Sequence, residues 1–123
     1  MLFSEEYRKF LKHANGWPGF YVSVDLFGTT ELVDGTALKI RNISTVKDFI
    51  ESIGLKLNQV VPIGASNHER DVFLLVSEIS TKLSGVVIWL SGYEVDRYDN
   101  FEVFFDAMLN NNEQIAEQLR RFR

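Results

Sequence analysis

The second half of the chain contains three short runs of apolar and β-branched residues, Val60–Ile63, Val72–Val76 and Val86–Leu90. Runs of this kind are typical of strands that are buried on both faces of a sheet. The polar segments between them, Gly64–Asp71 and Ser77–Gly85, have the length of loops or hairpin connections. The pattern therefore predicts a central sheet in which these strands follow one another without intervening helices.

Amphipathic helices are predicted on both sides of this block. Residues 4–14 carry apolar side chains at helical spacing, and a second such stripe lies between Ser44 and Gly54. Asn100 can cap a third helix, whose phenylalanines then face inward, and residues 115–122 suggest a short terminal helix.

Two shorter segments with strand character precede the three central runs. The alternation over Phe20–Leu26 predicts a half-buried strand, and Leu38–Ile40 is predicted to form a short strand or an irregular lead-in after the Asp34-Gly35 turn. Strands that cluster, instead of alternating with helices, indicate an α+β fold. We predict a single domain over residues 1–123, with a mostly antiparallel central sheet and helices packed on one side.

Composition limits the function. The 123 residues are 46% hydrophobic and 24% charged, as in an ordinary globular domain, and the absence of cysteine excludes disulfides and thiolate catalysis. No segment has the ~18 consecutive apolar residues of a membrane span, and the acidic N-terminus does not resemble a signal peptide, so we expect a cytoplasmic protein. The net charge of −4 disfavours nucleic acid and favours basic partners.

The residues that carry chemistry are few. His13 ends the first predicted helix, where an imidazole commonly bonds terminal carbonyls, and His68 lies beside Glu69 and Asp71 in a polar loop. Adjacent loop residues rarely converge on one point, and no metal-binding spacing accompanies them. The sequence also lacks a Gly-x-Ser-x-Gly nucleophile motif and a phosphate-binding glycine loop. We therefore expect no catalytic residue, no metal and no cofactor.

Acidic and aromatic residues are the candidates for binding a partner. Trp17 and Tyr21 belong to an aromatic group that can either fill the core or line a groove. The candidate acids are those expected to lie without nearby cations, and they fall into two stretches: Asp25, Glu31 and Asp34 in the first and Glu94, Asp96, Asp99 and Glu102 in the second.

Five ordered segments together resemble the SUKH superfamily (SMI/KNR type), which contains fungal cell-wall-synthesis regulators and bacterial immunity proteins. The first segment is a Tyr-x-x-Phe-Leu helix that ends in Asn-Gly. The second is Leu-Phe-Gly-x-x-Glu-Leu, and the third is Pro-Ile-Gly. The fourth is a glycine followed by an apolar strand with tryptophan, and the fifth is Asn-Phe-x-x-Phe-Phe. In this chain these are residues 4–16, 26–32, 62–64, 85–89 and 100–105. The tryptophan comes one residue early, and Ser4 stands where many members have proline.

The resemblance implies an α+β domain that binds another protein and catalyses nothing. We expect an immunity protein that neutralises a cognate bacterial toxin by direct binding, with a basic toxin domain such as a nuclease as its partner. Two alternatives remain open at this stage. One is a regulatory or scaffold module like the fungal members, and the other is a small enzyme or small-molecule binder that uses the His68 loop.

Overall fold

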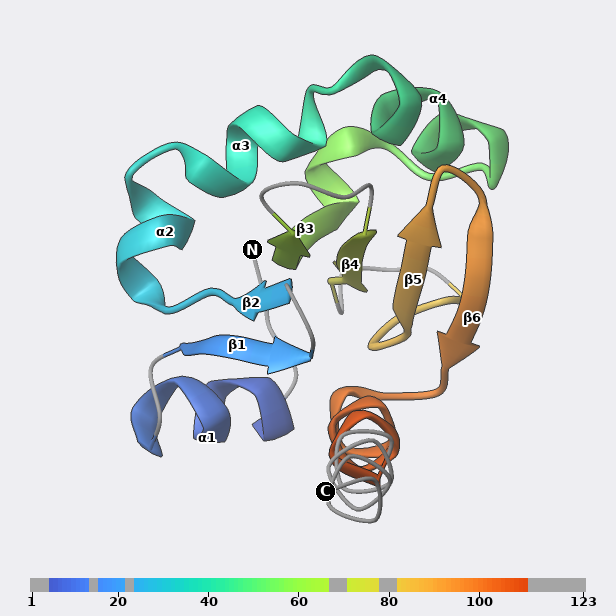
Figure 1. Cartoon of the computed structure of the whole chain (residues 1–123). Coiled ribbons are helices and arrows are strands. Elements are labelled where there is room, and N and C mark those ends of the chain that lie inside the picture. Colours follow the sequence, from blue (N-terminus) through green and yellow to red (C-terminus); the bar gives the residue numbers. More distant parts are fainter. Residues whose placement is uncertain (1–4, 14–15, 22–23, 67–70, 78–81, 111–123) are drawn as a thin grey trace, which may run out of the picture.

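Six strands form one sheet in which every strand pairs antiparallel with the next strand of the chain (Figure 1). The computed structural model describes residues 5–13, 16–21, 24–66, 71–77 and 82–110. The strands are β1 (Trp17–Tyr21), β2 (Val24–Leu26), β3 (Val60–Ser66), β4 (Asp71–Val76), β5 (Val87–Ser91) and β6 (Glu94–Tyr98). The three predicted central strands are thus confirmed as β3, β4 and β5, and the antiparallel α+β class is confirmed with them.

Along the chain, the helices come before, between and after the strands. They are α1 (Glu5–His13), α2 (Thr29–Val33), α3 (Thr36–Arg41), α4 (Ser44–Ser52), the 3-10 helix η1 (Leu57–Gln59) and a C-terminal helix over residues 101–110. The predicted helices at 4–14, at 44–54 and after Asn100 are confirmed. Asn100 caps the last of them, because its Oδ1 accepts a hydrogen bond from the Val103 backbone nitrogen at 2.9 Å. The predicted helix at 115–122 lies outside the described residues.

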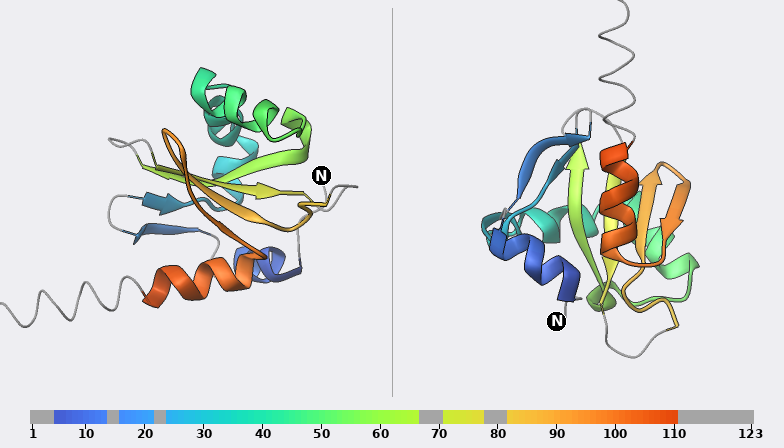
Figure 2. Two further views of the ribbon diagram at one scale, coloured as in Figure 1. Left: turned by 90° about the vertical axis from the view of Figure 1, so that its right-hand side faces the viewer. Right: turned by 90° about the horizontal axis from the view of Figure 1, so that it is seen from below.

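Helices cover both faces of the sheet, and the prediction of helices on one side was wrong. On β4, Phe73 and Leu75 join a core cluster with α1 and the C-terminal helix, whereas Val72 and Leu74 join a second cluster with α4. Figure 2 shows the two helix layers above and below the strands. The reason is that successive strand residues point to opposite faces of the sheet. A continuous apolar run therefore places apolar side chains on both faces, and each face must be buried by a layer of helices.

The first core cluster, between the sheet, α1 and the C-terminal helix, is largely aromatic. Phe73 of β4 is its centre: its ring packs edge-on to Phe104 with centroids 4.8 Å apart and to Trp89 at 5.7 Å. Tyr7 of α1 contacts Phe101 at 5.0 Å, which ties the N-terminal and C-terminal helices together. Each aromatic pair contributes about 0.5–1.5 kcal/mol beyond the burial of its surface.

Some elements differ from the sequence prediction. The alternating segment Phe20–Leu26 does not form one strand, because the chain reverses within it and gives the β1–β2 pair. Leu38–Ile40 lies in α3 instead of a strand. Asp34 Oδ1 accepts a hydrogen bond from the Thr36 backbone nitrogen at 2.9 Å, which satisfies a free donor at the start of that helix.

Three elements, α2, η1 and β6, were not predicted at all. Helix α2 is short, and its first turn is closed by the Glu31 side chain, whose Oε2 accepts a hydrogen bond from the Gly28 nitrogen at 3.2 Å. Strand β6 has no apolar run to reveal it, because four of its five residues are exposed and only Tyr98 is buried. Among the described strands β6 pairs with β5 alone, so it forms an edge of the sheet.

Candidate functional site

A groove of about 740 Å³ lies between one face of the sheet and the helices α3 and α4. Its floor comes from β2, β3, β4 and β5, and its wall comes from α3 and the first turn of α4. The arc of α2, α3 and α4 over these strands is visible in Figure 1. The groove therefore combines residues that are far apart in the sequence, and it is the candidate functional site.

The floor of the groove is a row of residues that run straight across the strands. Asp25 pairs with Ala65, Ala65 with Val72, and Val72 with Leu90. Directly paired residues point to the same face of a sheet. The row thus consists of one carboxylate followed by three apolar residues, of which Val72 and Leu90 are buried in the core. In register it continues to Glu94 on β6, so an acidic residue stands at each end.

Gly64 fixes the position of the acidic end. A β-carbon on Gly64 would lie 2.8 Å from the carbonyl oxygen of Asp25, and 3.3 Å from Cδ2 of Phe73. Any larger residue would collide with the backbone of β2 on one side and the aromatic core on the other. The glycine of the Pro-Ile-Gly segment is therefore the residue that lets β2 lie close to β3 and places Asp25 in the groove.

The wall of the groove carries polar groups as well as an exposed apolar side chain. Thr36 and Lys39 of α3 and Thr45 of α4 line it, and Ile43, which precedes α4, lines it with 49% of its surface exposed. Thr36 also donates its hydroxyl to Asp34 Oδ1 at 2.7 Å. Hydrogen bonds from the Thr36 side chain and backbone lower the pKa of Asp34 below its ordinary value, and the charge of Lys39 acts in the same direction.

The structure divides the first group of candidate acids among three surroundings. Asp25 lines the groove and Asp34 stands beside its wall, whereas Glu31 of α2 is half-buried and bonded to Gly28. Glu31 acts on Tyr7, a residue of the first core cluster. Burial is the main cause of the raised pKa of Tyr7, and the negative charge of Glu31 raises it further. Only two of the three acids are therefore associated with the groove.

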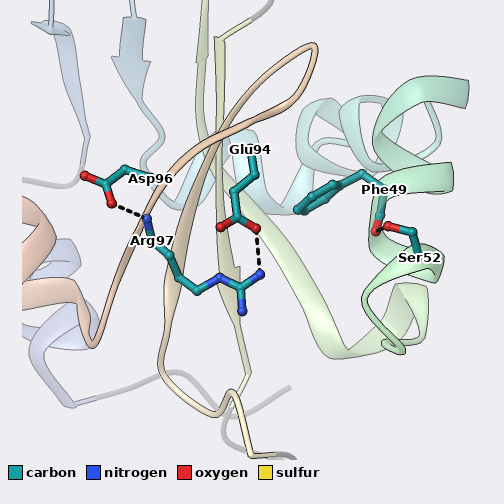
Figure 3. Close-up of polar contacts among 5 residues, drawn as sticks. All are labelled: Phe49, Ser52, Glu94, Asp96 and Arg97. Carbon is teal, nitrogen blue, oxygen red and sulfur yellow. Dashed lines mark hydrogen bonds and ion pairs between the residues drawn. The ribbon is translucent and has the colours of Figure 1, made fainter.

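The second group of candidate acids lies at β6 and the start of the C-terminal helix. The prediction that these acids lie without a nearby cation was wrong for Glu94, because Arg97 Nη2 donates a hydrogen bond to Glu94 Oε1 at 2.6 Å. Figure 3 shows this pair on the side of β6 that faces Phe49, with Asp96 on the other side. Asp96 Oδ1 accepts a hydrogen bond from the Arg97 backbone nitrogen at 2.7 Å.

The two groups of acids do not form one surface. Strands β3, β4 and β5 separate β2, which carries Asp25, from β6. Asp99 and Glu102 are exposed near the beginning of the C-terminal helix, away from the groove lining. Trp17 and Tyr21 begin and end β1, and their side chains lie outside what the structure describes.

The sequence prediction missed the residues of the groove wall. Thr36, Lys39, Ile43 and Thr45 were not singled out as site residues: the middle of α3 was expected to be a short strand or an irregular lead-in, and Thr45 belongs to the predicted second helix. One signal could have found Thr36: aspartate two residues before threonine, as in Asp34-Gly35-Thr36, is a pattern in which the side chain bonds the backbone at the start of a helix.

Only some of the other residues considered for catalysis or metal binding lie within the described part of the chain. His68 and Glu69 and the side chain of His13 lie outside the described residues. Asp71 accepts a hydrogen bond from Trp89 Nε1 at 2.9 Å, which gives the half-buried indole the partner that its donor needs. Within the residues that are described, no three His, Cys, Asp or Glu side chains come close enough to hold a metal ion.

None of the protein-family models, curated proteins or solved structures compared with this chain matches it. Among the helices of the described ranges, none has the length and apolar character required to cross a membrane. The assignment of function therefore depends on the residues and their geometry.

Proposed function

We propose that the chain is a non-catalytic protein-binding domain of the SUKH type and acts as an immunity protein that neutralises a cognate toxin by direct binding. The observation that carries the proposal is that all five segments resembling the family contribute to one core cluster. They contribute Tyr7, Phe10, Leu26, Phe27, Ile63, Val87, Phe101 and Phe104, with Trp89 packed against the cluster.

Direct contacts join several of these segments. The Phe27 backbone nitrogen donates to the Ile63 carbonyl oxygen at 2.8 Å, which connects the Leu-Phe-Gly segment to the Pro-Ile-Gly segment. Phe10 packs against Phe101 with ring centroids 5.4 Å apart and thus joins the first segment to the last. The order and spacing of the motifs are therefore those of one packed core, which supports the family resemblance.

The groove supports binding of a protein. Its lining includes an aspartate, and its rim includes the half-exposed Ile43, whereas Val72 and Leu90 at its base are buried in the core. Apolar surface that stays open and is bordered by polar groups is typical of interaction sites. The net charge of −4 favours a basic toxin domain, such as a nuclease, because opposite charge accelerates encounter and selects among partners.

Capture from the native host, followed by a toxicity assay, tests the proposal. The tagged chain is used to purify its partner, and the partner is then expressed in a test bacterium with and without this chain. We expect the partner to arrest growth when alone and to lose this effect when a stoichiometric complex forms. A partner that is harmless alone would contradict the immunity role and would instead favour the regulatory or scaffold alternative.

A further inference from the structure

The large apolar side chains that stay exposed at the groove lie on its rim. Ile43 lines the groove and leaves 49% of its surface exposed, whereas Val72 and Leu90 at the base are buried in the core. At the β5–β6 turn Gly92 lines the groove, and the next residue, Tyr93, is 70% exposed. A partner therefore finds apolar surface that is still open to water at the rim and not at the base.

Tyr93 is presented by a tight turn. The Ser91 backbone nitrogen donates a hydrogen bond to the Tyr93 carbonyl oxygen at 2.8 Å, and Gly92 between them has a φ of 75°. A left-handed φ of this kind favours glycine, so the sequence specifies the turn. Tyrosine offers a large contact area with little loss of side-chain entropy, and it is enriched among the residues that carry binding energy. The turn is thus suited to present an anchor residue.

Ile43 stands at a helix position that rarely contains isoleucine. It is the N-cap of α4, where serine, threonine, aspartate and asparagine are preferred, and its side chain makes no capping hydrogen bond. The side chain is half-exposed there instead of filling the core. A local preference that is broken without compensation inside the fold is typical of a functional site. A partner that covers Ile43 would provide the compensation.

Asp34 supplies an ordered carboxylate beside the same wall. Its Oδ1 accepts hydrogen bonds from the Thr36 backbone nitrogen at 2.9 Å and from the Thr36 hydroxyl at 2.7 Å, so Oδ2 takes part in neither bond. The two bonds orient the side chain before any partner arrives, which reduces the entropy lost on binding. Lys39 also lowers the pKa of Asp34, but its charge is the smallest of the causes. The exposed carboxylate can therefore accept a cation from a partner.

We infer that the rim of the groove docks the partner: Tyr93 and Ile43 pack against apolar side chains of a basic protein, and Asp34 binds one of its lysines or arginines. This inference rests on the proposed protein-binding function and assigns the surface and the chemistry of the contact. The net charge of −4 supports a basic partner, because opposite charge accelerates the encounter.

A titration of the ¹⁵N-labelled full chain with blocked peptides tests the surface. The probe is acetyl-Leu-Lys-Leu-Lys-Leu-Lys-amide. One control peptide has glutamate in place of every lysine, and the other has serine in place of every leucine. We expect the probe to shift the backbone amide signals of Asp34, Ile43 and Tyr93 and both controls to leave them unchanged, because the rim combines apolar surface with a carboxylate. Larger shifts on the C-terminal helix, or equal shifts with all three peptides, would overturn the inference.

Truncation of the apolar anchors gives a second test. Ile43→Ala is matched by Val103→Ala, since both residues are β-branched and Val103, on the C-terminal helix outside the groove lining, has a similar exposure of 46%. We expect Ile43→Ala to weaken binding of the probe by at least about threefold, Tyr93→Ala by about tenfold, and Val103→Ala to leave it unchanged. Dispersed amide spectra show that each variant is folded, and equal binding by Ile43→Ala and Val103→Ala would contradict the role of the rim.

The carboxylate is tested in the same way. Asp34→Asn keeps the oxygen that accepts from Thr36 and removes the charge, so we expect it to weaken binding of the probe by up to about fivefold, the range of one exposed ion pair. Asp48→Asn, which neutralises an exposed carboxylate of α4 outside the groove lining, is the matched control and should bind normally. Equal affinities of these two variants would remove Asp34 from the surface.

The captured partner separates this inference from the proposed function. If that partner neutralises with Tyr93→Ala and Ile43→Ala combined as tightly as with the unchanged chain, the rim inference fails while the immunity proposal stands. If the probe binds at the rim and the captured partner is harmless when expressed alone, the immunity proposal fails while the rim inference stands.

Discussion

Gly16 and Gly28 touch so closely that a β-carbon on Gly16 would lie 2.9 Å from the Gly28 backbone nitrogen. Gly16 also has a φ of 104°, a left-handed conformation that side chains disfavour. Gly16 belongs to the first of the five segments that resemble the SUKH family, and Gly28 belongs to the second. The contact brings the segment after α1 against the start of α2, so the backbone itself requires glycine at position 16.

Gly16→Ala should therefore be strongly destabilising. We expect a loss of about 2–4 kcal/mol in the free energy of unfolding, from the strained φ and the collision together. Gly54→Ala is the matched control, because Gly54 has a φ of 81° but no atom within 4 Å of the added carbon. It should cost only about 1–2 kcal/mol. Urea denaturation measures both values, and equal losses would show that the contact with Gly28 is unimportant.

Gly64→Ala should disturb the groove as well as the fold. The added carbon would meet the Asp25 carbonyl oxygen at 2.8 Å, so β2 must move away from β3. We expect a loss of roughly 1–3 kcal/mol in unfolding free energy, which urea denaturation measures. An unchanged free energy of unfolding would show that the close approach of β2 to β3 at Gly64 is unimportant.

Asp96 protects the open edge of the sheet. Its carboxylate accepts the hydrogen bond of the Arg97 backbone nitrogen, a group that another strand could otherwise bind. The register of the β5–β6 pair also shifts between Trp89 and Leu90 of β5, because Trp89 pairs with Asp96 and Leu90 with Glu94, and this interrupts a regular edge. Asp96→Ala is therefore expected to self-associate as its concentration rises, whereas Asp99→Ala, an exposed residue that follows β6, should not. Analytical ultracentrifugation compares the two, and two equally monomeric variants would contradict this role.

Thr36 should control the titration of Asp34. Its two hydrogen bonds stabilise the charged carboxylate, so in Thr36→Val, which keeps the backbone donor and removes the hydroxyl, the pKa of Asp34 should rise toward its ordinary value. A carboxylate with a lowered pKa stabilises the folded state above its ordinary pKa of 3.8 and loses this effect as the pH falls through the lower value. NMR titration of the Asp34 carboxyl carbon measures the shift, and an identical titration in both proteins would refute the assignment.

Charge reversal separates the two groups of candidate acids. Asp25→Lys with Asp34→Lys alters the groove, and Glu94→Lys with Asp96→Lys alters β6, with three strands between the two sites. We expect the first pair to slow association with the partner by about tenfold and to reduce its salt dependence, and the second pair to have a smaller effect. Stopped-flow mixing at several salt concentrations measures both. The opposite ranking would place the interface on β6.

The sequence was most informative where burial imposes a periodic pattern. The runs around Phe73 and Ile88 predicted β4 and β5, and the stripe of Val46 and Ile50 predicted α4, because these side chains are fully or almost fully covered. Strand β6 gave no such signal, since its residues are mostly exposed. The one-sided arrangement of helices was wrong although the apolar runs themselves require cover on both faces.

The candidate site was less predictable than the fold. Asp25 was singled out by its charge, but the row that it begins depends on pairing among four strands, and one sequence does not specify that register. The wall residues Thr36 and Lys39 depend on α3, a helix of six residues that is too short for a clear apolar stripe. Charge alone therefore indicated one member of the site and left its neighbours undetected.

The strand order has a consequence for how the chain acquires its structure. Strands β3 to β6 are consecutive neighbours joined by short connections, so their pairing closes small loops and can proceed early. Pairing of β2 with β3 must instead bring together the ends of residues 27–59, which include α2, α3, α4 and η1. Non-local pairing of this kind is slow. We therefore expect the groove, which needs β2 beside β3, to be assembled late in folding.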